Sequence, residues 1–374
     1  MSAQKYDLAI VGAGILGLSA ALAAAKRGLK VVVLDRSSRA MGASVRNFGF
    51  VTVTGQDRDH TWLRARRSRE IWLEVAGAAG IPIAQTGAWI TTQRPEATRV
   101  LEQFMASDMS EGCELLTQPE AKTRCPWLTH DHVGAVLWSP HELRVESVDA
   151  IPQLARWLSA HYGVVFLWNT AVQSIDLPVV STAQGPVLAE RAIVCPGEDT
   201  ISLYSDRPGM GAISRCQLQM LRLDSPGYRL PGTVMSDLSL LRYGGFAMQP
   251  AAHALRSRVS TELPQFLDQG IHLIIAQSAD GSLVVGDSHR YDQAVSPFAQ
   301  ESVDQMILEE FGRVTGRPAP AVRERWMGSY AYLANTPVFM DSPADNVRLA
   351  IVTSGIGAST GFAIGEELIS DLLS

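Results

Sequence analysis

Three glycines near the beginning of the chain have the spacing of a phosphate-binding turn. Gly12, Gly14 and Gly17 follow the apolar segment Leu8 to Val11 and precede an alanine-rich run. Between a strand and a helix, this spacing allows a tight turn, close approach of the backbone to a pyrophosphate and close packing of the helix on the strand. The helix also presents free N–H groups and its positive dipole end to the phosphates. The segment therefore predicts a dinucleotide-binding unit.

An acid at the end of the next apolar segment narrows the choice of nucleotide. Asp35 directly follows the segment Lys30 to Leu34. A carboxylate at this position can accept hydrogen bonds from both ribose hydroxyls, and it argues against a 2′-phosphate. FAD or NAD is therefore favoured over NADP.

A second glycine-rich junction lies near the C-terminus. The apolar segment Arg348 to Thr353 is expected to be a strand, and it runs into the loop Ser354 to Gly361. A terminal helix is expected from Phe362 to Leu373. A second anionic or polar part of a cofactor can bind at such a strand–loop–helix junction.

Composition and charge exclude several classes of protein. The chain has 374 residues, 46% of them hydrophobic, which is enough for two domains with a large core, and its net charge of −6 gives no global attraction to nucleic acid or anionic membranes. No apolar stretch reaches the roughly 18 residues that a membrane-spanning helix needs. The first strand is expected near Tyr6, which leaves no room for a signal peptide. We therefore expect a cytoplasmic protein with no nucleic-acid partner and no membrane insertion.

The cysteines and the one basic run carry no predicted site. Four cysteines are widely spaced without a CxxC pair, so neither a disulfide framework nor a metal site is indicated, and buried small side chains are expected at Cys113, Cys125, Cys195 and Cys216. Arginines between 58 and 69 alternate with apolar residues at helical spacing, which favours a solvated helix face over a phosphate-binding patch.

Strand and helix patterns continue after an interruption at 36–55, which is polar and rich in glycine. Helices are expected over 57–79, 99–110, 148–162 and 301–314. Strands are expected over 87–92, 133–138, 164–168, 191–195, 217–223, 271–277 and 283–286, with a hairpin turn at Asp280–Gly281 before the last of them.

Six segments together resemble the FAD-dependent amine oxidoreductases related to D-amino acid, glycine and sarcosine oxidases. They are the first glycine turn, the segments 42–49, 194–197, 216–220 and 280–287, and the terminal Gly-x-Gly-x-x-Thr-Gly junction. The resemblance covers essentially the whole chain. Within the family, the segments 43–49, 216–220 and 286–291 look similar to a subgroup associated with bacterial phosphonate catabolism, which acts on aminoalkylphosphonates or their N-methyl derivatives.

The resemblance implies an α/β fold with two interleaved domains. One is an FAD-binding domain of the glutathione-reductase type, with a Rossmann-like architecture, expected over 1–80, 148–213 and 320–374. The other is an α+β substrate domain, whose antiparallel sheet covers the flavin, expected over 81–147 and 214–319.

The resemblance also implies where FAD is held. The binding is expected to be noncovalent, because no cysteine follows Cys216 in the region where some relatives tether the flavin. The residues expected to contact FAD are Gly12, Gly14, Ile15, Leu16, Gly17, Asp35, Arg36, Ser44, Arg46, Asn47, Gly49, Phe50, Val172, Gly197, Gly355, Gly357, Thr360 and Gly361.

The implied reaction needs few reactive side chains. A hydride leaves the carbon next to a neutral amine for flavin N5, and the resulting imine hydrolyses to an aldehyde or keto product. The protein must keep the amine deprotonated, anchor an anionic group and exclude water. Arg46 and His289 are the candidate catalytic residues, and Arg46 is the leading anion anchor because a guanidinium grips a carboxylate or phosphonate with two hydrogen bonds. The candidate substrate-binding residues are Arg46, Tyr243, His289, Arg290, Trp326 and Tyr330.

Several alternatives stay open at this point. Arg46 can instead pair with an acid, His289 can be a hydrogen-bonded structural residue, and the aromatic residues can belong to the core. An NAD-dependent dehydrogenase would share the first glycine turn but would not require the C-terminal junction. A partner-dependent flavin subunit of a hetero-oligomeric oxidase is a further alternative. The electron acceptor is oxygen or another carrier, and the chain is a monomer or a homodimer.

Overall fold

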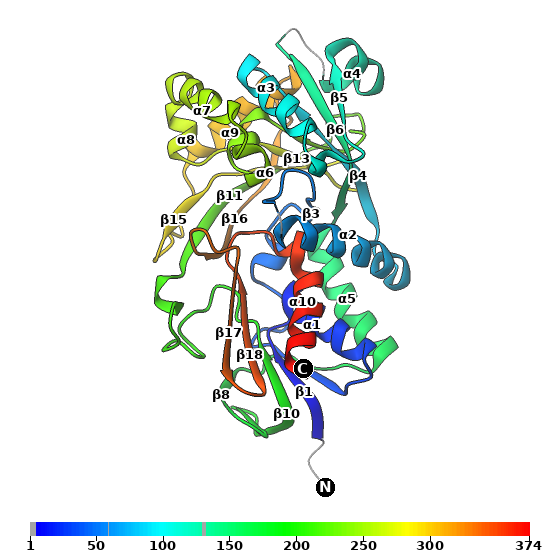
Figure 1. The fold of residues 1–374 in the computed structure, drawn as a ribbon, viewed down its shortest axis with the longest axis vertical. Coiled ribbons are helices and arrows are strands. Elements are labelled where there is room, and N and C mark those ends of the chain that lie inside the picture. Colours follow the sequence, from blue (N-terminus) through cyan, green and yellow to red (C-terminus); the bar gives the residue numbers. More distant parts are fainter. Residues whose placement is uncertain (1–4, 59, 129–131) are drawn as a thin grey trace.

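The computed structural model describes residues 5–58, 60–128 and 132–374. Two sheets lie towards opposite ends of the long axis, and the chain passes between them several times (Figure 1). The first and last described helices lie at the end that holds the first sheet, and they pack side by side.

Within the described residues, the first sheet has eight strands: β1 (Lys5–Val11), β2 (Val31–Leu34), β7 (Val165–Leu167), β8 (Val172–Asp176), β9 (Val179–Thr182), β10 (Val187–Val194), β17 (Val338–Ala344) and β18 (Val347–Val352). The order is β17–β18–β10–β1–β2–β7, and β9 pairs with β10 and β8. The run from β18 to β7 is parallel. Leu8 and Ile10 of β1 are fully buried, as a covered parallel sheet requires.

Helices α1 (Ile15–Lys26), α2 (His60–Ala79), α5 (Ser147–Tyr162) and α10 (Gly357–Leu373) pack together beside this sheet (Figure 1). Small residues let α1 and α10 approach closely, because a Cβ at Gly365 would lie 2.6 Å from the carbonyl carbon of Ser19. The ring of Trp72 on α2 packs edge-on against Phe362 at 5.0 Å. Helices α1 and α2 are thereby both held against α10.

The second sheet has ten described strands, which are β3 (Phe50–Val51), β4 (Ile83–Thr91), β5 (Glu114–Thr117), β6 (Ala135–Val145), β11 (Ser214–Leu223), β12 (Thr233–Met235), β13 (Ile274–Gln277), β14 (Leu283–Gly286), β15 (Arg290–Asp292) and β16 (Val322–Tyr332). Its order is β15–β11–β14–β13–β12–β4–β6–β3, with β16 on β11 and β5 on β6. All pairs are antiparallel except β12 with β4.

Several helices border the second sheet: α3 (Pro95–Met105), α4 (Gln118–Arg124), α6 (Gly244–Ala247), α7 (Ala251–Glu262), α8 (Pro264–Asp268) and α9 (Glu301–Thr315). The largest hydrophobic cluster lies here, and the rings of Phe104 and Phe246 meet in it at 4.6 Å. The short helices η1 (Ala43–Val45) and η5 (Asp237–Leu241) lie in loops that reach the candidate site.

The expected fold class is confirmed: a Rossmann-like α/β sheet is interleaved with a second, mainly antiparallel sheet. Strands β3 and β16 pair within the second sheet, although their residues fall in segments expected for the FAD-binding domain. The domain boundaries themselves stay a prediction.

Two helices begin earlier than expected. Helix α10 begins at Gly357 rather than Phe362, because the small residues of the junction form its first turn against Ile15 of α1. Helix α3 begins at Pro95 rather than Arg99, since proline is well suited to the first helical turn. The sequence patterns did not predict α7 or β16.

The basic run forms a solvated helix face, as expected. Arg64 and Arg67 of α2 pair with Glu367 and Glu366 of α10. Cys113, Cys125 and Cys216 are free and buried, whereas Cys195 is free but only half-buried, since it lies beside the first glycine turn. Among the described helices, none combines the length and the apolar character that a bilayer crossing demands.

Candidate active site

One cavity of about 680 Å³ is bounded by both sheets. At one end it is lined by the turn between β1 and α1, the end of β2 and the loop that carries η1. At the other end it is lined by residues of β11 and β16, the turn after η5 and the loops around β13 and β14. Its volume lies within the usual range for cofactor and ligand sites.

The glycine turn at the first end leaves no room for side chains. A Cβ at Gly12 would lie 2.3 Å from the carbonyl oxygen of Cys195, and one at Gly17 would lie 1.9 Å from that of Gly12. The N–H of Ile15, at the start of α1, donates to Ser44 Oγ over 2.9 Å. The turn therefore offers backbone N–H groups and a hydroxyl to a phosphate-bearing ligand.

Asp35 is held at the wall of this end. Its Oδ2 accepts the N–H of Ala13 over 2.8 Å and its Oδ1 accepts that of Ser37 over 2.8 Å. A carboxylate has about four acceptor positions, so further positions remain for the hydroxyls of a ribose. The donor and acceptor set fits the adenosine half of FAD.

Most of the residues expected to contact FAD line this cavity. They are Gly12, Gly14, Ile15, Leu16, Gly17, Asp35, Arg36, Ser44, Arg46, Asn47, Phe50, Val172, Gly197, Gly355 and Gly357. Arg36 also pairs with Asp199, and the Asn47 amide holds its own loop by accepting from Gly49 N and Ser147 Oγ.

Three expected FAD contacts lie outside the cavity wall. A Cβ at Gly49 would lie 1.7 Å from the carbonyl oxygen of Val145, so this glycine serves a close backbone crossing. Gly361 faces Ile15 across the α1–α10 contact, and the hydroxyl of Thr360 donates to Ile356 O over 3.0 Å. The structure therefore places these three in packing contacts, because the helix that carries two of them begins earlier than the sequence suggested.

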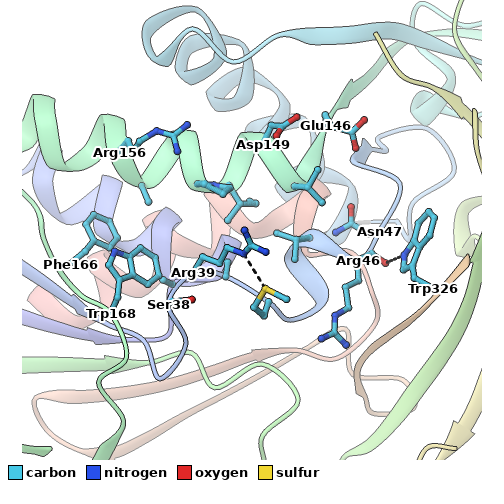
Figure 2. A pocket seen from close by; sticks show the side chains of 18 of the residues that line it. Ser38, Arg39, Arg46, Asn47, Glu146, Asp149, Arg156, Phe166, Trp168 and Trp326 are labelled. Atoms are coloured by element: carbon cyan, nitrogen blue, oxygen red, sulfur yellow. Dashed lines mark hydrogen bonds between the residues drawn. The ribbon is translucent and has the colours of Figure 1, made fainter. Parts of the chain in front are cut away.

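A second cavity, of about 1220 Å³, adjoins the first and shares part of its lining (Figure 2). Arg46 and Asn47 line both cavities. The guanidinium of Arg46 points away from Glu146 and Asp149 in Figure 2, and it forms no ion pair with any acid in the part of the chain that the structure describes. The alternative in which Arg46 pairs with an acid is therefore not observed.

Trp326 and Arg290 do not reach the first cavity. Trp326 lines the second one, where its Nε1 donates to the Arg46 carbonyl over 3.3 Å. Arg290 is exposed on β15. Tyr243, His289, Tyr330 and Arg46 do line the first cavity, so these four of the six substrate candidates are brought together.

Arg242 is a cavity residue that the sequence did not single out. It follows η5 and donates from its guanidinium to the hydroxyl of Tyr330 over 2.9 Å. No described carboxylate forms an ion pair with it. A cation directed into a cavity without an acid partner favours an anionic ligand.

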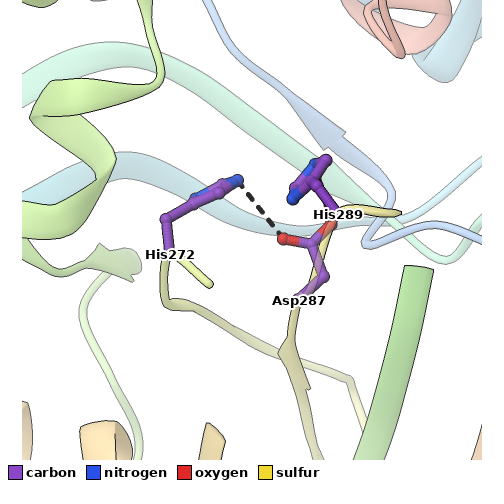
Figure 3. A group of neighbouring side chains, drawn as sticks. All are labelled: His272, Asp287 and His289. Carbon is purple, nitrogen blue, oxygen red and sulfur yellow. Dashed lines mark ion pairs between the residues drawn. The ribbon is translucent and has the colours of Figure 1, made fainter. Parts of the chain in front are cut away.

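His272 and Asp287 were also missed, and they lie beside His289 (Figure 3). The Nε2 atom of His272 is 3.3 Å from Asp287 Oδ1, and that of His289 is 3.8 Å from Oδ2. All three residues are at least 93% buried, and the two imidazoles stack with centroids 5.0 Å apart. His272 and Asp287 are brought opposite each other because the N–H of Asp287 donates to His272 O over 3.0 Å.

Burial controls the charge of this group. Burial raises the pKa of Asp287 to about 8, although the positive charge of Arg242 opposes that rise. Burial lowers the pKa of His272 to about 3, with a further contribution from Arg242. The pKa of His289 falls well below its usual value, through burial and then through Arg242 and His272. Both imidazoles are therefore neutral at pH 7.

Two imidazoles and a carboxylate whose ligand atoms lie within 4.8 Å of one another are also a donor set known from metal sites. The positive charge of Arg242 acts on all three residues and repels a divalent cation. A singly charged ligand group with N–H donors is better matched to this environment.

A signal for the missed residues was present in part. Asp287 and His289 share one face beyond β14, because residues two apart in an extended segment point the same way. His272 is a polar residue at the start of an expected apolar strand. Arg242 stands in no recognisable motif, and only the fold brings it to the cavity.

The chain has recognisable relatives among known proteins. A family model described as "FAD dependent oxidoreductase" (DAO) matches residues 7–371. Monomeric sarcosine oxidase from Bacillus sp. (strain B-0618) is 26% identical over 209 residues, which cover 54% of this chain and 53% of that protein. One of the subunits of opine oxidase from Rhizobium meliloti is 29% identical over 149 residues, which cover 36% of this chain and 40% of that one. The matched segments thus span about half, or less, of these curated relatives.

A crystal structure of glycine oxidase from Bacillus cereus ATCC 14579 has the same fold, with a TM-score of 0.77 and 18% identity over 98% of this chain and 95% of that one. The cavity described above is lined by a glycine turn, by an acid at the end of β2 and by a second glycine-rich junction, a set that fits FAD. Because the matching family is described as FAD dependent, the alternative of an NAD-dependent dehydrogenase is not supported. Because the family model covers nearly the whole sequence, the chain belongs to the FAD dependent oxidoreductase family.

Proposed function

We propose that this chain oxidises a small primary or N-methyl amine that carries an anionic group, either an amino acid or an aminoalkylphosphonate. Bound FAD supplies the oxidising power, since its ring accepts a hydride from the carbon next to the nitrogen. The imine formed from the substrate then hydrolyses to an aldehyde or keto product. The similarity to proteins named as a sarcosine oxidase and as part of an opine oxidase supports an amine substrate.

The observation that carries this proposal is a cation in the cavity, Arg242, that forms no ion pair with a described carboxylate. Arg242 lines the cavity at the end away from Asp35, and the hydrogen bond described for its guanidinium goes to the neutral hydroxyl of Tyr330. A desolvated cation is costly unless an anion neutralises it. The planar guanidinium can bind two oxygens of a carboxylate or phosphonate side by side. Arg46, on the wall of the same cavity, is proposed as a second anion contact.

Apolar groups of the same cavity would exclude water from the reacting carbon. Phe48, Phe50 and Leu218 line the cavity, and Tyr243 contacts His272 edge-on at 5.9 Å between ring centroids. Removal of water strengthens every charge interaction within the site. The protein would thus orient the substrate, supply a charge that binds it and exclude water from it.

A panel of amines tests the proposal. Oxygen-free holoenzyme is mixed with glycine, sarcosine, 2-aminoethylphosphonate or its N-methyl derivative, and the absorbance of oxidised flavin is followed. At least one amine is expected to bleach the flavin, whereas acetate and methylphosphonate, which lack the amine, leave it oxidised. Failure of the whole panel would overturn an anionic amine as the substrate class.

The same panel decides the finer proposal of a phosphonate substrate. The similarity of the segments 43–49, 216–220 and 286–291 to a phosphonate-associated subgroup supports it. Faster bleaching by the phosphonates than by the amino acids is the expected result. The reverse order would assign the chain to amino acids.

A partner-dependent flavin subunit is the second candidate function, because one relative is named as a subunit of an opine oxidase. Bleaching by the isolated chain would exclude this alternative. We propose instead that the chain acts by itself as a monomer or homodimer, with oxygen or another carrier as electron acceptor. Its four free cysteines fit the reducing cytoplasm, which we propose as its location.

We also propose that FAD is bound noncovalently. Cys216, the last cysteine of the sequence, is fully buried within β11. Cys195 lies at the phosphate end of the cavity, beside Gly12. Acid precipitation should therefore release all of the flavin into the supernatant, and flavin that stays with the protein would contradict the proposal.

A further inference from the structure

We propose that Asp287, flanked by His272 and His289, binds the ammonium group of the substrate and accepts a proton from it, while Arg242 binds the anionic end. This inference rests on the proposed function and deepens it, since it assigns both poles of a zwitterionic substrate to named residues. It also supplies what the reaction needs first, which is a neutral amine.

The hydrogen bonds around the two imidazoles fix where their lone pairs point. His289 Nδ1 is 3.0 Å from the carbonyl oxygen of Gly270, which can only accept, so Nδ1 carries the proton. Ser239 Oγ lies 3.4 Å from Leu273 O and 3.2 Å from His272 Nδ1, so a hydroxyl that donates to Leu273 O accepts from Nδ1. In the tautomers with the proton on Nδ1, both Nε2 lone pairs are left free on the side of Asp287.

Once Asp287 has lost its proton, the group consists of acceptors that lack a donor. Two Nε2 lone pairs and the carboxylate of Asp287 face one another, and Asp287 Oδ1 is buried with no hydrogen-bond partner in the described chain. A buried acceptor without a donor is costly, so the arrangement calls for a ligand that brings protons. An alkylammonium group has three N–H donors and one positive charge, which matches three acceptors around one acid.

The remaining ionisable groups near Asp287 are uncharged at neutral pH. Cys216, Tyr243, Tyr291 and Tyr330 approach from β11, the turn after η5, β15 and β16, and burial raises the pKa of each of them. Arg242 is thus the fixed charge among the described groups that act on Asp287. The cavity thus holds a cation, Arg242, and a group of acceptors around Asp287. These are complementary to the anionic group and the ammonium group of a zwitterionic substrate.

The proton transfer conserves atoms and electrons. An N–H bond of the ammonium breaks, its electron pair stays on nitrogen, and the proton binds a carboxylate oxygen of Asp287. The C–H bond next to the nitrogen then breaks with its electron pair going to FAD, while the nitrogen lone pair forms the C=N bond. The amine is oxidised by two electrons and FAD is reduced by two.

The environment of Asp287 makes it a suitable base. An alkylammonium has a pKa of about 10.4, and an ordinary carboxylate near 3.9 would take its proton only about once in 10⁶ times. Burial raises the pKa of Asp287 to about 8 and reduces this disadvantage to a few hundredfold. General bases work best when their pKa lies near the operating pH.

The pH dependence of flavin reduction in Asp287→Asn tests the proton transfer. The ratio of the reduction rate constant to the substrate Kd is measured from pH 6 to pH 10.5. For the unaltered protein we expect this ratio to rise with pH and to level off near pH 8. In Asp287→Asn we expect a loss of about 100-fold at pH 7 and a limb that moves up to the pKa of the substrate ammonium. An unchanged profile in the variant would overturn the proposal.

Glu310→Gln is the matched control. Glu310 is also fully buried, and its pKa is also raised by burial, to about 7, but it lies beside Arg94 and Asp237 outside the cavity. Its replacement should leave the limb near pH 8 in place. A shift of the limb in Glu310→Gln rather than in Asp287→Asn would assign it to the wrong carboxyl and overturn the proposal.

A binding series separates the ammonium site from the proposed reaction, because it needs no turnover. Dissociation constants are measured by isothermal titration calorimetry on holoenzyme whose flavin has been reduced in advance, so that no ligand can be oxidised, for acetate, methylphosphonate, glycine and aminomethylphosphonate. Asp287→Asn should weaken the amino ligands at least about tenfold and leave the amine-free anions within about threefold. Equal weakening of both sets would show a merely structural role and overturn the proposal, even if no amine reduces the flavin.

Metal analysis of the purified holoenzyme closes the test. We expect no stoichiometric transition metal. One equivalent of zinc or iron that is lost in Asp287→Asn would assign the three residues to a metal and overturn the ammonium site.

Discussion

The two ends of the cavity are built in different ways. The end at Gly12 and Asp35, which we assign to the nucleotide and call the nucleotide end, consists mainly of backbone. It is built from the glycine turn, the N-terminus of α1 and one carboxylate that is itself held by N–H groups. The substrate end consists of side chains, which come from η5, β16 and the loops around β13 and β14. The pyrophosphate of FAD is always the same, so backbone groups suffice to bind it, whereas substrate discrimination needs side chains that can vary.

The backbone end should fail completely when a single methyl group is added. In Gly17→Ala the new Cβ would lie 1.9 Å from Gly12 O, so the turn or α1 must move, at a cost of about 3 kcal/mol or more. We expect protein without FAD and with a lower Tm, measured by the ratio of flavin to protein absorbance and by thermal unfolding. Gly77→Ala is the control, since nothing lies within 4 Å of its added Cβ on α2. Full FAD loading of Gly17→Ala would contradict the packing role of this turn.

Changes at the substrate end should weaken substrate binding without loss of FAD. Arg242→Met should weaken substrate binding by about 2 to 4 kcal/mol, because a charged pair in a dry site is broken, and should leave FAD in place. Substrate Kd is measured by the saturation of flavin reduction. Arg46→Ala reports the second anion contact, and exposed Arg290→Met is the control. A larger effect for Arg290 than for Arg242 would contradict the assignment of the anion site.

Asp287 should cost stability at neutral and alkaline pH. Its pKa is raised by burial to about 8 in the folded protein, above the value near 3.9 of an unfolded chain. The folded state therefore holds its proton more tightly, and stability falls as the pH rises from about 4 to about 8. Asp287→Asn removes this dependence, so we expect it to be more stable than the unaltered protein at pH 8, on the order of 2 kcal/mol, with little difference at pH 4.

Chemical unfolding at several pH values measures that difference. A gap between Asp287→Asn and the unaltered protein that stays constant from pH 4 to pH 8 would show that Asp287 does not titrate in this range.

Asp35 should have the smallest effect of the four. Asp35→Asn keeps the shape of the wall but removes the charge that accepts from Ala13 and Ser37 and, in the holoenzyme, from the ribose. The affinity for FAD should fall by about 1 to 2 kcal/mol, measured by titration of the apoprotein with FAD. No change in the FAD Kd would remove Asp35 from the cofactor site.

Sequence patterns predicted the nucleotide end because its parts are adjacent in the chain. Gly12 to Asp35 form one strand–turn–helix–strand unit, and each step of it has its own local signal. The second junction lines the same cavity at residues 354–359, but its helix begins at Gly357, because contact with α1 places the glycines in the first turn.

The substrate end was only partly predictable. Tyr243, His289 and Tyr330 line the cavity as expected. Trp326 and Arg290 do not, because Trp326 lies four residues before Tyr330 on β16, where residues 324–327 line the second cavity, and β15 lies at an exposed edge. Arg242 and His272 were missed because no local pattern marks a residue whose partners lie tens of residues away and meet it only through the antiparallel sheet.

A crystal structure of the holoenzyme with bound methylphosphonate tests the central claim most directly. The account predicts the FAD diphosphate on the Gly12 turn, the flavin ring beside the Gly355 to Ser359 junction and the phosphonate on Arg242, next to an open position at Asp287. A flavin ring directed towards Trp326, or a phosphonate bound at Arg290, would contradict it.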